Sequence, residues 1–121
     1  MSDFSLLGSP AMAQLERYLD LSVFRHGLIS SNLANIDTPG YRTRDVNFGA
    51  ELHRATGELQ YASLVPAAHP VQGLLERPDG NNVSLERESL LLAHTQLGFN
   101  TGVQLLRAEF RRLSLAINEG K

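Results

Sequence analysis

Two long stretches of the chain carry apolar residues at every third or fourth position, the spacing of one face of an α-helix. The first stretch begins at Ser9-Pro10 and runs without a further proline to Pro39. Serine is a favoured N-cap, proline suits the first helical position, and the residue before a proline avoids the α region. The pattern predicts a helix over residues 10–36. The apolar row along it, called here the first seam, consists of Met12, Leu15, Leu19, Ser22, His26, Ile29, Leu33 and Ile36.

The second stretch lies in the C-terminal third of the chain. Ser84 is a suitable N-cap, Glu86 and Glu88 suit the positive end of the helix dipole, and Gly120 is a stop signal. The pattern predicts a helix over residues 85–118, weakened by Gly98 and Gly102, which cost about 1 kcal/mol each relative to alanine. Its second seam consists of Leu92, Gln96, Phe99, Val103, Leu106, Phe110, Leu113 and Ile117.

The middle of the chain, residues 38–82, is rich in proline and glycine and is predicted to be irregular. Weak alternation over 41–48 and 59–65 is compatible with a short β pair. Residues 48–55 favour a short helix that buries Phe48 and Leu52, and residues 66–78 are typical of a loop. The string Pro78-Asp79-Gly80-Asn81 predicts a turn.

The predicted helices are long for a chain of 121 residues. They would measure roughly 40 and 50 Å, whereas a compact globule of this size is about 35 Å across. We therefore expect a mainly α, elongated antiparallel hairpin of the two terminal helices, forming one domain over residues 1–121. Some apolar residues lie off both seams and favour contacts with partner helices: Leu21, Phe24, Leu28, Leu90, Leu91, Leu97 and Leu105.

A polar string closes the first predicted helix. Asn32 and Asn35, next to the small residues Ser31 and Ala34, form a narrow polar face that suits close helix approach. The simpler interpretation is a plain helix end followed by a Pro-Gly turn.

The string is nevertheless similar to the N-terminal signature of bacterial flagellar rod and hook proteins. That signature has a long helix, an Asn-Leu-Ala-Asn string, a small linker, a Thr-Pro-Gly-Tyr string and a basic residue. Here it corresponds to residues 32–42. Residues 44–48 and 79–88 further resemble the proximal-rod branch of that family. Residues 50–78 match nothing in the family and are short for it.

The resemblance implies a structural, non-enzymatic subunit of the proximal rod of the flagellar basal body. Such subunits polymerise through their terminal helices and transmit torque. They reach the periplasmic rod through the type III export apparatus, without a cleaved signal peptide. The implied partners are further copies of the subunit, other rod subunits, a rod-base adaptor, the membrane-ring protein and the export apparatus.

The resemblance also implies which residues mediate assembly. The motif residues are Asn32, Leu33, Ala34, Asn35, Thr38, Pro39, Gly40 and Tyr41. The seam residues, which would pack as in a coiled coil, are Leu15, Leu19, Ile29, Leu33, Leu92, Phe99, Val103, Leu106, Phe110 and Leu113. Buried Asn32, Asn35 and Gln96 would fix the register of the packing, as polar core residues do in coiled coils. The turn at residues 38–40 would aim residues 41–80 at a neighbouring subunit.

Composition narrows the remaining function classes. A hydrophobic content of 42% and a charged content of 20% indicate a folded chain. The net charge of −2 argues against a nucleic-acid binder, and the absence of cysteine excludes disulfides and thiolate metal sites. The short apolar runs predict no membrane span, and the first residues lack the basic and apolar regions of a secretory signal.

Candidate catalytic chemistry is weak. The four histidines form no recognised metal motif, and no nucleophile or phosphate-loop signature is present. We therefore expect no catalytic, cofactor or metal site. His26 is expected in the interior or an interface, and the basic cluster at residues 107–112 on a solvated face or in interface ion pairs. The alternative function is a soluble helical adaptor or export-chaperone-like protein that binds flagellar partners without polymerising.

Overall fold

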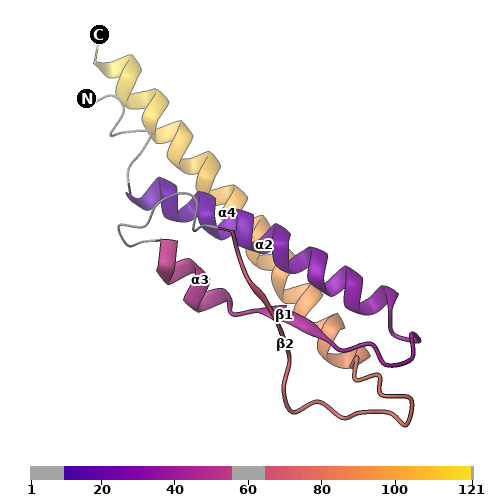
Figure 1. Ribbon diagram of the computed structural model, residues 1–121. Coiled ribbons are helices and arrows are strands. Elements are labelled where there is room, and N and C mark those ends of the chain that lie inside the picture. The colour runs from indigo at the N-terminus through magenta and orange to yellow at the C-terminus, as the bar shows by residue number, and fades with distance from the viewer. Residues whose placement is uncertain (1–9, 56–64, 121) are drawn as a thin grey trace.

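A computed structural model describes residues 10–55 and 65–120, and it is an elongated pair of long helices with a small side layer (Figure 1). Helix α2 (Pro10–Ala34) and helix α4 (Leu85–Glu119) pack against each other in antiparallel directions. Between them in the chain come strand β1 (Arg44–Val46), helix α3 (Phe48–Ala55) and strand β2 (Ala68–Pro70). The predicted mainly α, elongated hairpin with a short β pair is confirmed.

The side layer lies along α2. Strands β1 and β2 form an antiparallel two-stranded sheet in which Asp45 is opposite His69, and α3 packs on the first half of α2. The interpretation of residues 66–78 as loop throughout is wrong, because residues 68–70 pair with β1. Most of the alternation predicted over 59–65 falls outside the described residues.

Helix α2 is contacted on two sides, by α4 and by the side layer, and this explains where the first seam fails. The pattern left Leu21 off the seam, yet its side chain is fully buried, with 0% exposed. His26, expected in an interior or interface, is exposed to solvent in this chain. The buried face of α2 is broader than the seam and consists of Met12, Arg17, Leu21, Ser22, Ile29 and Asn32.

The contact between α2 and α3 is partly charged. Glu51 of α3 is buried and accepts hydrogen bonds from Arg17 at 3.5 Å, Arg54 at 2.7 Å and the backbone N–H of Ala67 at 3.3 Å. Phe48 and Leu52, which were expected to be the buried residues of this helix, are half-buried. The α3 anchor is therefore an ion-paired glutamate more than an apolar pair.

Two glycines let α4 approach α2 closely. A Cβ atom built on Gly98 would lie 2.3 Å from the Tyr18 hydroxyl oxygen, and one built on Gly102 would lie 2.8 Å from Leu19 Cδ2. The Tyr18 ring is itself held edge-on against Phe48 of α3, with 5.3 Å between the ring centroids. These glycines, which weaken the isolated helix, thus seat α2 side chains on α4.

Alanine at residue 98 should report this contact. In Tyr18→Phe protein, Gly98→Ala should raise the free energy of unfolding by about 0.5–1 kcal/mol, because helix propensity improves and the next ring atom is already at van der Waals distance. In Tyr18 protein the clash with the hydroxyl should cancel that gain. Urea denaturation of the four proteins measures the difference, and an equal effect of Gly98→Ala in both backgrounds would contradict the contact.

Candidate assembly site

The signature residues lie at the end of α2 and in the turn that follows. Residues 38–41 form what is called here the signature turn, in which the Tyr41 N–H donates to the Thr38 carbonyl at 3.2 Å. Gly40 has φ of +78°, a conformation that costs glycine little and other residues more. Pro39 followed by such a glycine is the sequence of a type II β-turn, which turns the chain sharply away from the helix.

Asn35 and Thr38 close the helix end. The Asn35 side chain donates to the Ser31 carbonyl at 2.8 Å and accepts from the Thr38 hydroxyl at 2.9 Å. A terminal carbonyl of α2 and the first residue of the turn are thereby joined through one amide. The simpler interpretation of this string, a helix end with a Pro-Gly turn, describes these contacts well.

Asn81 ties the signature turn to the chain just before α4. Its buried side-chain amide donates to the Asn35 carbonyl at 2.9 Å and to the Thr38 carbonyl at 2.8 Å, while its Oδ1 accepts from the Val83 N–H at 2.8 Å. Gly80, with φ of +89°, brings this segment against the backbone of Gly40. The two ends of the helical hairpin are therefore joined through backbone groups.

The next residues continue this pairing. The Asn82 N–H donates to the Tyr41 carbonyl at 3.3 Å, and Asn82 Oδ1 accepts from the Thr43 N–H at 2.7 Å. The Thr43 hydroxyl donates to the Asn82 carbonyl at 3.2 Å, and both side chains are buried. The chain leaving α2 and the chain entering α4 are held side by side.

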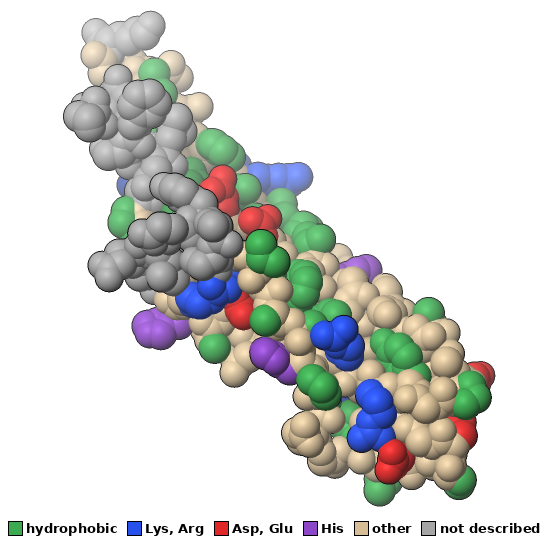
Figure 2. Space-filling model, viewed as in Figure 1, with side chains coloured by type: hydrophobic (Ala, Val, Ile, Leu, Met, Phe, Trp, Pro, Cys, Tyr) green, Lys and Arg blue, Asp and Glu red, His purple; other side chains and the backbone are tan. Residues whose placement is uncertain are grey.

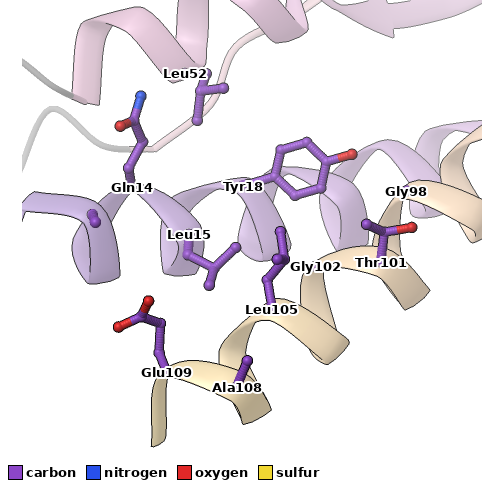
Figure 3. Close-up of a pocket in the computed structure, with 11 residues that line it drawn as sticks. Gln14, Leu15, Tyr18, Leu52, Gly98, Thr101, Gly102, Leu105, Ala108 and Glu109 are labelled. Atoms are coloured by element: carbon purple, nitrogen blue, oxygen red, sulfur yellow. The ribbon is translucent and has the colours of Figure 1, made fainter. Parts of the chain in front are cut away.

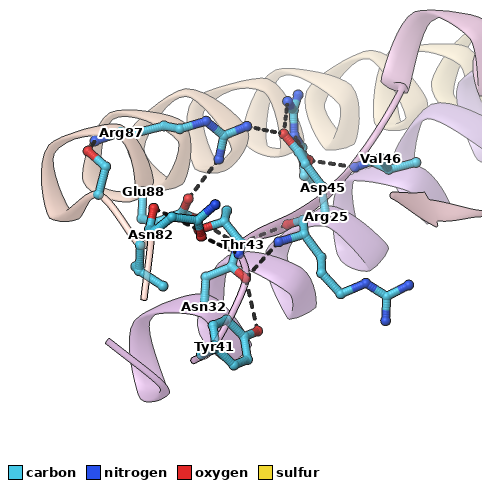
Figure 4. A network of polar contacts seen from close by, with 12 residues as sticks. Arg25, Asn32, Tyr41, Thr43, Asp45, Val46, Asn82, Arg87 and Glu88 are labelled. Carbon is cyan, nitrogen blue, oxygen red and sulfur yellow. Dashed lines mark hydrogen bonds and ion pairs between the residues drawn. The ribbon is translucent and has the colours of Figure 1, made fainter. Parts of the chain in front are cut away.

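Asn32 uses its whole side-chain amide. Its Nδ2 donates to the Arg44 carbonyl at 2.9 Å and to Glu88 Oε1 at 3.1 Å, while its Oδ1 accepts from the Tyr41 hydroxyl at 3.0 Å and the Arg44 N–H at 3.2 Å. Only 1% of the residue is exposed. The amide thus pairs with β1 as a neighbouring strand would, and it links α2, β1 and α4 at one point (Figure 4).

Charged groups extend from this point, and together they are called the Asn32 network: Arg25, Asn32, Tyr41, Asp45, Arg87 and Glu88 (Figure 4). The fully buried Glu88 accepts from Arg87 at 2.7 Å, and Arg87 also donates to Asp45 at 2.6 Å. Arg25 of α2 grips both oxygens of Asp45, at 3.0 and 2.8 Å. Such a two-pronged pair is the geometry that arginine provides and lysine does not.

The Asp45 carboxyl is held in its charged form. Burial raises its pKa, but hydrogen bonds from Arg25, the Val46 N–H and Arg87 lower the pKa more, so that it lies below the usual value for aspartate. A carboxyl with a lowered folded-state pKa stabilises the fold above its unfolded pKa and loses that contribution as the pH falls through the folded value.

Acid should therefore loosen the attachment of β1. The free energy of unfolding should fall as the pH is lowered through about 4 and below, where aspartate becomes protonated. Asp45→Asn should be less stable near neutral pH and show a shallower decline, since it has no carboxyl to protonate at this position. Denaturant unfolding at a series of pH values measures both slopes. Parallel curves for the two proteins would contradict the assigned role of Asp45.

The seam residues differ in how far the hairpin covers them. Ile29 is buried and Phe110 is 51% exposed. The others are half-buried: Leu15, Leu19, Leu33, Leu92, Phe99, Val103, Leu106 and Leu113. Gln96, expected as a buried register residue, is exposed and bonds to Asn100 within its own helix at 3.4 Å. The part that the seam and motif residues play in assembly stays a prediction.

Apolar surface remains outside the hairpin core. Figure 2 shows apolar side chains exposed along the length of the molecule. A groove of about 530 Å³ also runs between α2, α3 and α4, with Leu15, Tyr18 and Leu52 on one side and Gly98, Gly102 and Leu105 on the other (Figure 3). The described chain thus leaves both an apolar groove and an apolar outer surface available for contact.

Several residues of the site were not identified from the sequence. Glu88 was expected to serve the helix dipole, but it is fully buried against Asn32. Arg25, Asp45 and Asn81 carried no periodic signal, because their partners lie 20 to 46 residues away. The available signal was the run Asp79-Gly80-Asn81-Asn82, whose two asparagines are more than a turn requires.

Metal and membrane chemistry can be assessed over the residues that the structure describes. Within 10–55 and 65–120, His, Asp and Glu side chains form no group of three or more that could hold a metal ion. None of the helices described combines the length and apolar character of a membrane span.

Known proteins resemble this chain over most of its length. A family model described as "Flagella basal body rod protein" matches residues 28–42, which include the signature. The basal body rod protein FlgB of Cereibacter sphaeroides is 36% identical over 106 residues, covering 77% of this chain and 82% of the relative. The chain belongs to the FlgB family of flagellar basal body rod proteins. FlgB of Salmonella typhimurium is 30% identical over 122 residues, covering 84% of this chain and 88% of the relative.

FlgB family membership confirms the resemblance identified in residues 30–41 and 79–88. The chain is a structural component of the proximal rod of the flagellar basal body. Its relatives are structural rod proteins, and no described feature favours the non-polymerising adaptor. In this FlgB-family chain the matched residues 28–42 coincide with the helix end, the signature turn and Asn32. The family signature therefore maps onto the point where α2, β1 and α4 meet.

Proposed function

We propose that this subunit polymerises through its terminal helices in the rod and thereby transmits torque. The observation that carries the proposal is a row of exposed leucines on α4, on the side away from α2. Leu90, Leu97 and Leu115 are 72%, 67% and 57% exposed, and their spacing places them on one face of the helix. Because the opposite face already packs on α2, this row, called here the outer row, is free to contact a neighbouring helix.

A drive shaft needs contacts that repeat without closing into a ring. Contacts between two different surfaces of identical or related subunits generate such helical arrays. Apolar burial would provide most of the association energy, at about 25 cal/mol per Å². Rigid attachment of the side layer would resist slippage, and the Asn32 network and the signature turn supply that attachment. In this proposal the turn aims residues 41–80 at an adjacent subunit.

The remaining parts of the proposal rest on family membership. The chain acts without catalysis, as one rod-type domain over residues 1–121, and leaves the cell by type III export without a cleaved signal peptide. It occupies the periplasmic rod, where it contacts copies of itself, other rod subunits, the rod-base adaptor and the membrane-ring protein. The FlgB relatives and the matched signature support this placement.

A charge placed in the outer row tests the proposal. Leu97→Glu should leave the helix content and the unfolding midpoint of the purified chain within about 0.5 kcal/mol of wild type, since the position is exposed. It should nevertheless prevent the subunit from being incorporated into basal bodies in the source bacterium, because a buried unpaired carboxylate is costly. Ser89→Glu, also exposed on α4, is the matched control.

The readouts are the subunit content of isolated basal bodies and swimming on soft agar. Loss of incorporation with Leu97→Glu but not with Ser89→Glu supports assembly through the outer row. Normal incorporation of folded Leu97→Glu protein would overturn it.

A further inference from the structure

The apolar inner face of α4 continues beyond the first described residue of α2. Figure 1 shows α4 running past the start of α2. Phe110 and Ile117 are 51% and 59% exposed, and Leu113 between them is half-buried. All three continue the seam whose earlier members face α2. Among the described residues, this last part of the face has no helix packed against it.

The register of the hairpin predicts what would lie there. Asn32 bonds to Glu88, and Leu19 lies 2.8 Å from a Cβ position built at Gly102. Since α2 and α4 are antiparallel and rise equally per residue, each step toward the start of α2 is one step toward the end of α4. Carried past Pro10, this register places position 7 opposite Leu113 and position 4 opposite Ile117.

The sequence has apolar side chains at both positions. Residue 4 is Phe and residue 7 is Leu, three apart and thus on one face of a continued helix. Nine residues precede Pro10, and at 1.5 Å per residue they would extend about 13 Å. The part of α4 from Phe110 to Glu119 measures about 15 Å on the same scale. The length and the apolar spacing of the preceding segment therefore match the uncovered face.

We propose that residues 1–9 of the same chain cover this face, with Phe4 and Leu7 packed on Phe110, Leu113 and Ile117. A segment joined directly to Pro10 acts at a high effective concentration, which a separate chain in dilute solution does not reach. The inference concerns contacts within one chain and goes beyond rod assembly. It holds or fails separately from the role of the outer row.

Disulfide trapping tests the proposal, and the chain helps because it contains no cysteine. The double variant Leu7→Cys/Leu113→Cys is oxidised with copper–phenanthroline in air as a dilute monomer, and the products are separated on a non-reducing gel. We expect an intrachain bond to form at least about tenfold faster than in Leu7→Cys/Leu97→Cys, because a disulfide requires the two Cα atoms to approach within about 7 Å. Leu97 is the control because it lies in the outer row.

Hydrogen exchange in the full chain gives a second test that needs no cross-link. Phe4→Ser/Leu7→Ser should raise the exchange rates of the amides in residues 110–118 several-fold while leaving those in residues 88–95 unchanged. Equal linking rates in the two cysteine pairs, or interchain dimers as the main product, would overturn the proposal. Unchanged exchange over residues 110–118 would also overturn it, whatever the result of the rod-assembly tests.

Discussion

Replacing Asn32 with leucine should lower the free energy of unfolding by about 3–5 kcal/mol, a large share of the stability of a domain this size. Leucine matches the volume but makes none of the four hydrogen bonds. The Arg44 N–H and carbonyl would lose their Asn32 partner, and Glu88 Oε1 would be left buried without its donor. The Tyr41 hydroxyl would retain its contact with Ser31 at 3.2 Å.

Asn35→Ala is the control for this prediction, because it removes an asparagine of the same signature from a more exposed setting. Its loss should cost about 0.5–1.5 kcal/mol. Urea unfolding followed by circular dichroism measures both variants. If Asn32→Leu were no less stable than Asn35→Ala, the Asn32 network would not be the joint that we describe.

Replacing Pro39-Gly40 with Ala-Ala should abolish rod assembly while leaving export intact. Alanine at residue 40 must adopt the φ of +78° that Gly40 has, at a cost of about 1–2 kcal/mol. Loss of Pro39 further widens the unfolded ensemble, at about 0.4–1 kcal/mol. The turn should relax, and the carbonyls that Asn81 holds should move out of reach.

Gly49→Ala is the matched glycine control. No atom lies within 4 Å of a Cβ atom at this position in α3, and Gly49 has no positive φ. That variant should assemble normally and be slightly stabilised by helix propensity. Export is measured by the amount of subunit secreted, and assembly by subunit content in basal bodies and by motility. Normal motility of the Pro39-Gly40 variant would refute the role assigned to the turn.

The long helices were predictable from sequence because their signals are local. Capping at Ser84, the stop at Pro39 and the repeated three–four spacing all act within a few residues. The burial of Leu21 was not predictable in the same way. It depends on β1 and α3 folding back onto α2, and a seam drawn for two helices has no term for a third layer.

The polar contacts of the site were the least predictable part. Asn32 and Glu88 are separated by 56 residues, and neither belongs to an apolar period. The family resemblance marked Asn32 as important without indicating its partner. Glu88 at the start of a helix has a sufficient local explanation in the helix dipole, and this local explanation concealed the long-range one.

The most direct test of the central claim is to locate this subunit in intact basal bodies by electron cryomicroscopy. We predict density for the α2–α4 pair in the proximal rod, with Leu90, Leu97 and Leu115 against a helix of a neighbouring subunit and the Asn32 network intact. A subunit absent from the rod, or present with the outer row facing solvent, would contradict assembly through the terminal helices.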